Sequence, residues 1–223
     1  MAVQTGEGTV EIIYQPSSVP AGPRTLGGFL ARPALEGQWP TVMVFGDEPI
    51  PTSPLKYLCM VFARHGLAAF APDFTVDPVR NLSIARAVAA FFADPAGNWS
   101  NAQHGYGLVA FGSGATDLAA LAATDFRADA FATVGSSIDD VIANKLADAA
   151  IPGLVIVSRG DTSVDVDATV SHRDALSLAS FVVYPTGDAG FWNDDAEGYD
   201  DTRAKDAMSR VIEFFQTQLP ERI

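Results

Sequence analysis

The chain has 223 residues, of which 27 are acidic and 14 are basic, so its formal net charge is -13. A chain of this length can bury one large core, and so acidic a surface repels nucleic-acid phosphates and anionic lipid headgroups. The single cysteine, Cys59, excludes an intrachain disulfide and a cysteine metal cluster. Residues 1–7 lack the basic and apolar segments of a secretory signal. We therefore expect a cytoplasmic protein without nucleic-acid or membrane partners.

Short β-like runs, each followed by a helix-like pattern, are typical of βαβ units around a mostly parallel sheet. The apolar run at 41–45, ended by Gly46, predicts a strand covered on both faces. Apolar side chains at helical spacing in 55–65, followed by Gly66, predict a helix that packs on this sheet. In chain order, the predicted elements are strands 9–14 and 26–31 as an antiparallel pair, strand 41–45, helix 55–65, strand 67–71, helix 82–93, strand 108–111, helix 116–123, strands 130–134, 154–157 and 181–184, and helix 202–218.

The sequence shows no sign of a boundary between two domains. It contains no internal repeat, no low-complexity tract and no linker rich in proline, glycine or serine. Its longest apolar stretches are also far shorter than the roughly 18 residues that cross a bilayer. We therefore predict a single α/β domain over residues 1–223, with a mixed, mainly parallel sheet and helices on both faces.

Three segments carry a resemblance to a known family. They are Gly-Gly-Phe-Leu-Ala-Arg-Pro at 27–33 with Trp-Pro at 39–40, Gly-Leu-Ala-Ala-Phe-Ala-Pro-Asp at 66–73, and the stretch from Tyr184 through Asp200 that leads into the last helix. Together they resemble the dienelactone hydrolase family, a compact branch of the α/β-hydrolases, from about residue 26 to the C-terminus. The resemblance implies hydrolysis of ester or lactone bonds by a nucleophile, an acid and a histidine, in that chain order.

The resemblance allows each member of this triad to be checked by position. In the turn at 110–114, Gly112 stands where the nucleophile belongs, and glycine has no side chain to attack with. Asp161 is retained as the acid, whereas Ala189, two residues before Phe191, stands at the position of the histidine. A hydroxyl or thiol is a poor nucleophile until an oriented base takes its proton. Gly112 and Ala189 are therefore vestigial triad positions.

The resemblance also implies a carboxylate-binding arginine, and Asn193 stands in its place. The family's glutamate after the first parallel strand aligns with Asp47, and Glu48 follows it. With Asp161 and Asp188, these acids fall on loops at the carboxyl ends of strands, where open α/β sheets bind ligands. Clustered carboxylates bind a hard cation, or raise one another's pKa, or are simply solvated. We predict no metal and no cofactor.

Ser113 is an alternative nucleophile, although Phe111 stands where a serine turn requires a small residue. In the other interpretation, Ser113 begins or caps the helix. Of the three histidines, which are the ordinary bases at neutral pH, His65 falls in the last turn of a helix and His104 at the opposite end of the sheet. Only His172 lies on a segment able to reach the site. Cys59 has the spacing of a buried core residue.

Two functions follow from these positions. The first is a hydrolase scaffold that has lost covalent catalysis and binds a small molecule. Phe111, Phe191 and Trp192 then line a pocket for an apolar or aromatic ligand, and the protein is a monomer or a homodimer.

The second function is an ester or lactone hydrolase with a relocated catalytic group. That group is Ser113 with His172, or a water molecule activated by Asp161 or Asp188. The sequence favours the first function, because two triad members are absent in register and loss of either removes most of the triad's contribution.

Overall fold

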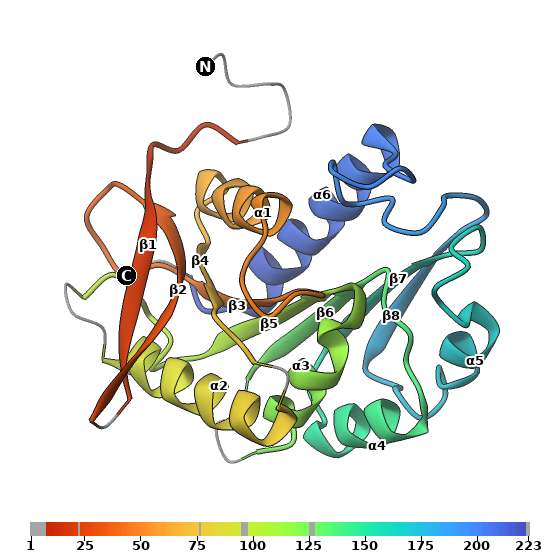
Figure 1. The fold of residues 1–223 in the computed structure, drawn as a ribbon, viewed down its shortest axis with the longest axis horizontal. Coiled ribbons are helices and arrows are strands. Elements are labelled where there is room, and N and C mark those ends of the chain that lie inside the picture. The colour runs from red at the N-terminus through yellow and green to blue at the C-terminus, as the bar shows by residue number, and fades with distance from the viewer. Residues whose placement is uncertain (1–7, 22, 76, 95–97, 125–127, 222–223) are drawn as a thin grey trace.

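Strands in the described part of the chain form one sheet with the order β1-β2-β4-β3-β5-β6-β7-β8 (Figure 1). This computed structural model describes residues 8–21, 23–75, 77–94, 98–124 and 128–221. The β1–β2 and β2–β4 pairs are antiparallel, and every later pair is parallel. The strands are β1 Ile12–Ala21, β2 Arg24–Pro33, β3 Thr41–Phe45, β4 Ala68–Pro72, β5 Tyr106–Phe111, β6 Ala130–Val134, β7 Gly153–Ser158 and β8 Ala179–Tyr184.

Helices cover both faces of this sheet, which confirms the predicted fold class. Figure 1 shows α1 and α6 on one face and α2, α3 and α4 on the other. The helices are α1 Ser53–Arg64, α2 Pro78–Ala93, α3 Ala115–Ala122, α4 Asp140–Ala149, α5 Val166–Ser171 and α6 Asp201–Gln218, with a short 3-10 helix η1 at Gly112–Gly114. None of the helices in the described ranges is long and apolar enough to span a membrane.

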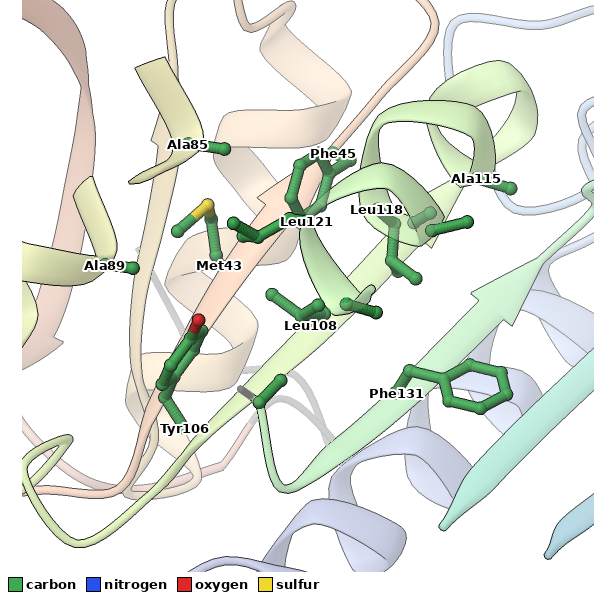
Figure 2. Packing of buried hydrophobic residues seen from close by; sticks show 14 of the residues in the cluster. Met43, Phe45, Ala85, Ala89, Tyr106, Leu108, Ala115, Leu118, Leu121 and Phe131 are labelled. Carbon is green, nitrogen blue, oxygen red and sulfur yellow. The ribbon is translucent and has the colours of Figure 1, made fainter. Parts of the chain in front are cut away.

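Two apolar layers form the core, one on each face of the sheet. Successive side chains of a strand point to opposite faces, so Val42 and Val109 pack beneath α1 and α6. Their neighbours Met43 and Leu108 point towards Leu121 of α3 in the other layer (Figure 2). Strands β3 to β7 are buried along their whole length. Each fully buried large apolar side chain contributes about 1.5–3 kcal/mol.

Helix boundaries differ from the prediction where capping residues decide them. Helix α2 begins four residues before position 82, because the Asp77 side chain accepts the backbone N–H of Val79 and a proline occupies the first turn. The helices α4 and α5 were not predicted. The inward stripe of α4 is rich in alanine, and α5 has only six residues. The first strand begins at Ile12, not at residue 9 as predicted, and both strands of the pair run further than predicted, to Ala21 and from Arg24 to Pro33.

The parallel strands bring five turns to one edge of the sheet, because their carboxyl ends all point the same way. These turns follow β3, β5, β6, β7 and β8, and they contain Asp47, Gly112, Gly135, Asp161 and Ala189 respectively. This is the edge at which the sequence places the candidate site.

Candidate functional site

Strand β5 turns into a helix at Gly112, whose φ of +58° lies in the left-handed region that favours glycine. The helical turn η1 starts at this residue and continues into α3. A sharp strand-to-helix turn of this kind is the backbone feature that exposes the nucleophile in α/β-hydrolases. A Cβ added at Gly114 would lie 2.8 Å from the carbonyl carbon of Phe45, so this turn packs directly on the end of β3. We define residues 112–114 as the elbow, and its first residue is a glycine, which has no side chain to act as a nucleophile.

Asp47 occupies the space that a side chain at residue 112 would need. A Cβ added to Gly112 would collide with both carboxylate oxygens of Asp47. The Asp47 Oδ1 atom accepts the backbone N–H of Ser113 at 2.5 Å. In an elbow hydrolase, the N–H of the residue after the nucleophile is an oxyanion-hole donor. Here the Asp47 carboxylate already accepts a hydrogen bond from this N–H group.

Ser113 is exposed, but its side chain makes no helix-capping hydrogen bond. Ser113 lies in η1 at the start of this helical segment, so the interpretation that it begins the helix is confirmed, but its side chain does not cap the helix and Asp47 accepts its backbone N–H instead. In the described part of the chain, no hydrogen bond joins the Ser113 hydroxyl to a histidine or to a carboxylate.

Asp161 lies in the turn after β7, and its side chain is only 3% exposed. One carboxylate oxygen accepts both the backbone N–H of Ser163, at 2.9 Å, and the Ser163 hydroxyl, at 2.5 Å. The other oxygen faces the turn after β6, where a Cβ on Gly135 would lie 3.8 Å from it and 3.0 Å from Trp192 Nε1. Sequence reasoning missed Gly135, although a glycine directly after a predicted strand is a recognisable turn signal.

The loop that carries Ala189 is anchored against the acid turn. The Ser158 hydroxyl donates to the Gly187 carbonyl at 2.7 Å. Arg203, in the first turn of α6, donates to the Thr186 hydroxyl and to the carboxylate of Asp200. These bonds hold the loop that carries Ala189 at its position. The sequence did not indicate this anchoring, because its members are far apart in the chain.

The aromatic side chains support the site from below. Phe111 and Phe191 are completely buried and Trp192 is 8% exposed. The Phe111 and Trp192 rings lie 5.0 Å apart, and Phe191 packs edge-on against Tyr184 at 5.7 Å. The expectation that Phe111 and Phe191 line an open pocket is therefore wrong, because both belong to the apolar core. Phe111 and Phe191 therefore support the candidate site from the core and do not line it.

The remaining candidate residues are dispersed. Asn193 fixes its own loop, since its side-chain oxygen accepts the backbone N–H of Asp195 at 3.0 Å. Glu48 and Asp188 are exposed. Within the described ranges, no three His, Cys, Asp or Glu side chains converge closely enough to hold a metal ion.

In the described part of the chain, none of the three histidines makes a hydrogen bond with the elbow. His172 caps the end of α5, and its Nε2 lies 3.7 Å from Asp140 at the start of α4. His65 is bonded through Nδ1 to the Val61 carbonyl at 2.9 Å. Cys59 is fully buried, as predicted, and burial raises the pKa of its thiol.

The chain is similar to known proteins both in sequence and in fold. The dienelactone hydrolase family model matches residues 98–219, which is more than half of the chain. A search of curated protein sequences found no match. Among solved structures, a Klebsiella pneumoniae subsp. pneumoniae protein assigned as a dienelactone hydrolase is 23% identical, with a TM-score of 0.79 over 92% of this chain and 99% of that chain.

Two further structures are similar at lower identity. A dienelactone hydrolase-like promiscuous phosphotriesterase from metagenomic libraries is 15% identical, with a TM-score of 0.77 over 94% of this chain and 99% of that one. An esterase of Pyrobaculum calidifontis is 14% identical, with a TM-score of 0.72 over 95% of this chain and 87% of that one. At these identities the likeness establishes a shared fold and not a shared reaction.

Proposed function

Since this chain belongs to the dienelactone hydrolase family, we propose that Gly112 and Ala189 stand in place of the family's nucleophile and histidine, and that the chain binds a small molecule at the elbow without hydrolysing it. The observation that carries this proposal is the position of Asp47. Its carboxylate fills the space of the nucleophile and accepts the Ser113 N–H at 2.5 Å.

Loss of either triad member is by itself enough to remove most of the triad's contribution to the rate of hydrolysis, so the two losses do not add. Loss of the nucleophile or the base of a triad costs about 10⁶-fold in kcat. Loss of one oxyanion-hole donor costs about 10²–10³-fold. The Asp47 contact adds to this, because a negative charge beside the elbow repels a developing oxyanion. Hydrolysis by the family's scheme is therefore not supported.

Charge at this edge favours a neutral or cationic ligand. Asp47, Glu48 and Asp188 are exposed acids, and Asn193 stands where the family resemblance implies a carboxylate-binding arginine. An apolar or aromatic part of such a ligand would have to contact Trp192, which is 8% exposed, because Phe111 and Phe191 are completely buried. A chain whose single cysteine is a free thiol also suits the reducing cytoplasm.

A hydrolase with relocated groups is the second candidate. It is favoured by the buried Asp161, which keeps the ordered carboxylate of a triad, and by the exposed hydroxyl of Ser113. His172, or a water molecule held by Asp161 or Asp188, would then have to take the proton.

A hydrolysis assay separates the two candidates. The purified protein is offered p-nitrophenyl acetate, p-nitrophenyl butyrate and dihydrocoumarin, beside the variants Ser113→Ala and Asp161→Asn, and is treated with a fluorophosphonate probe. We expect no covalent adduct and no turnover that depends on either residue. Turnover abolished by either substitution would establish the hydrolase instead.

Binding is tested with three aromatic probes of the same size and different charge, namely benzylamine, benzyl alcohol and benzoate. We expect the amine or the alcohol to raise the melting temperature more than benzoate does, and Asp47→Asn to reduce the effect of the amine. Equal effects of all three probes, or an amine effect that Asp47→Asn leaves unchanged, would contradict a site at the elbow.

A further inference from the structure

The turn after β6 lies between the elbow and the turn that carries Asp161, because β6 pairs with β5 on one side and with β7 on the other. Its first residue, Gly135, has a φ of +62°. Two polar side-chain atoms lie beside this glycine. A Cβ built on Gly135 would be 3.0 Å from Trp192 Nε1 and 3.8 Å from Asp161 Oδ2. An indole N–H donor and a carboxylate acceptor therefore lie close to one point at the carboxyl edge of the sheet.

Neither of these two atoms has a hydrogen-bond partner within the described part of the chain. Ser163 donates its backbone N–H and its hydroxyl to Oδ1 of Asp161, which leaves Oδ2 without a donor. The indole N–H of Trp192 likewise has no acceptor among the described residues. By contrast, the indole N–H of Trp39 donates to the Leu35 carbonyl at 3.2 Å. Buried polar groups in folded proteins are normally paired, so an unpaired donor beside an unpaired acceptor indicates a place for a ligand.

A ligand can reach both atoms. Asp161 is 3% exposed and Trp192 is 8% exposed. The described side-chain atoms that are both fully covered and unpaired are Asn101 Oδ1, Thr133 Oγ1 and Ser136 Oγ. Asp161 Oδ2 and Trp192 Nε1 are unpaired but are not among these, so they lie in the small exposed parts of their side chains. The last of the covered atoms belongs to the residue directly after Gly135, which gives this turn a further unpaired polar group.

The two atoms together select the chemistry of the ligand. A carboxylate oxygen only accepts hydrogen bonds, and an indole N–H only donates them. A hydroxyl satisfies both, because its proton goes to Asp161 and its oxygen accepts from Trp192. An ammonium group would leave the indole N–H unpaired. A ketone or a carboxylate would place a second acceptor against the Asp161 oxygen.

We propose that Asp161 and Trp192, on either side of Gly135, bind the hydroxyl group of a neutral aromatic alcohol whose ring contacts Trp192. This inference rests on the proposed function and names the class of its ligand. At the elbow itself, the Ser113 N–H is already bonded to Asp47. The neighbouring turn therefore supplies the unpaired groups that fix the ligand. A glycine is needed at position 135, because a side chain there would fill the point that the two atoms share.

Titration with 1-phenylethanol and acetophenone, followed by ¹H–¹⁵N NMR, tests the role of the hydroxyl, because the two compounds share one carbon skeleton. We expect the alcohol to bind about ten- to a hundredfold more tightly, the usual effect of a hydrogen bond to a charged group. In Asp161→Asn, the two bonds from Ser163 keep the amide oxygen on their side, so the NH₂ group faces the ligand. The preference for the alcohol should then fall below threefold or reverse.

The same spectra locate the ligand. The alcohol should shift the indole N–H signal of Trp192, which the variant Trp192→Phe identifies. It should leave the signal of Trp39 in place, because that N–H is already bonded to a carbonyl. Gly135→Ala should abolish binding, since its methyl group would lie 3.0 Å from Nε1. Gly66→Ala is the matched control and should bind normally, because its φ is also positive but its Cβ makes only an ordinary contact.

The outcomes separate this inference from the proposed function. If benzylamine binds in a manner that depends on Asp47 but 1-phenylethanol binds no more tightly than acetophenone, the proposed function stands and the alcohol site is overturned. If none of these compounds binds, both are overturned. A preference for the alcohol that Asp161→Asn leaves unchanged also overturns the site, and this decides the case even if Gly135→Ala does not fold.

Discussion

The carboxylate of Asp47 accepts the backbone N–H of Ser113 at 2.5 Å, and this bond joins the turn after β3 to the turn after β5. Asp47 reaches this donor because residue 112 is a glycine, since a Cβ there would collide with both carboxylate oxygens. The glycine at position 112 and the bond from Ser113 to Asp47 thus belong to one arrangement, because only a residue without a side chain leaves room for this carboxylate.

This coupling predicts a non-additive effect on stability. Gly112→Ala adds a positive-φ strain of about 1–2 kcal/mol, and it displaces the Asp47 carboxylate from its hydrogen bond with the Ser113 N–H. Gly66 is a matched control, because its φ is +83° but an added Cβ would lie 3.5 Å from the Trp39 ring, an ordinary contact. We expect Gly112→Ala to lower the free energy of unfolding by more than Gly66→Ala does. The measurement is urea unfolding at neutral pH.

The same comparison in an Asp47→Ala background isolates the collision. There the cost of Gly112→Ala should fall to that of Gly66→Ala, because only the backbone strain remains. Equal costs of Gly112→Ala in both backgrounds would show that Asp47 does not occupy this space.

Rebuilding the missing parts should restore nucleophilic chemistry. The variant Asp47→Ala with Gly112→Ser frees the Ser113 N–H and supplies a hydroxyl at the elbow. Adding Ala189→His places an imidazole on a loop that Ser158 holds against the acid turn. We expect this histidine to raise kcat/KM for p-nitrophenyl butyrate by about 10²–10⁴-fold, the usual contribution of a general base. A fluorophosphonate probe should label the rebuilt variant.

The control for this experiment is the same rebuilt variant with Asp161→Asn. Since an oriented acid is needed to hold the histidine, the gain in kcat/KM should largely disappear. A gain that survives Asp161→Asn would mean that the new histidine does not act through Asp161.

Sequence reasoning predicted the layers and the parallel strands, because uninterrupted apolar runs such as 41–45 and 130–134 are properties of neighbouring residues. It also predicted that Asp47 and Gly112 lie at one edge, because chain order fixes which strand ends point there. It did not predict the contact between them. That contact depends on the length of one side chain and the absence of another on a different strand. The anchoring of residue 187 by Ser158 was missed for the same reason.

The bond from Ser158 to the Gly187 carbonyl predicts a cost in stability. Ser158 is fully buried, and Ser158→Ala removes its hydrogen bond to the half-buried Gly187 carbonyl, which costs about 0.5–1.5 kcal/mol. Ser171→Ala is the control, because its hydroxyl also bonds a backbone carbonyl, that of Ala168 at 2.6 Å, but on an exposed surface. Urea unfolding should show the larger loss for Ser158→Ala. Hydrogen exchange should be faster in its 186–190 loop.

The contact of Tyr184 with Asp206 predicts how stability responds to alkaline pH. Burial raises the pKa of Tyr184 above its ordinary value of 10.0, and its hydroxyl donates to Asp206 at 2.5 Å. Above pH 10 the unfolded chain loses the tyrosine proton while the folded chain keeps it. The free energy of unfolding should therefore fall as pH rises through this value. Burial also raises the pKa of Tyr106, which contributes with the same sign.

The variant Tyr184→Phe tests this assignment, since phenylalanine keeps the ring but has no proton to lose. Urea midpoints measured from pH 8 to 11 should fall less steeply for Tyr184→Phe than for the unaltered chain. Tyr14→Phe is the control, because Tyr14 is 56% exposed on β1 and its substitution should leave the slope unchanged. A slope that Tyr184→Phe does not alter would place the alkaline transition in another group, with Tyr106→Phe as the next variant to measure.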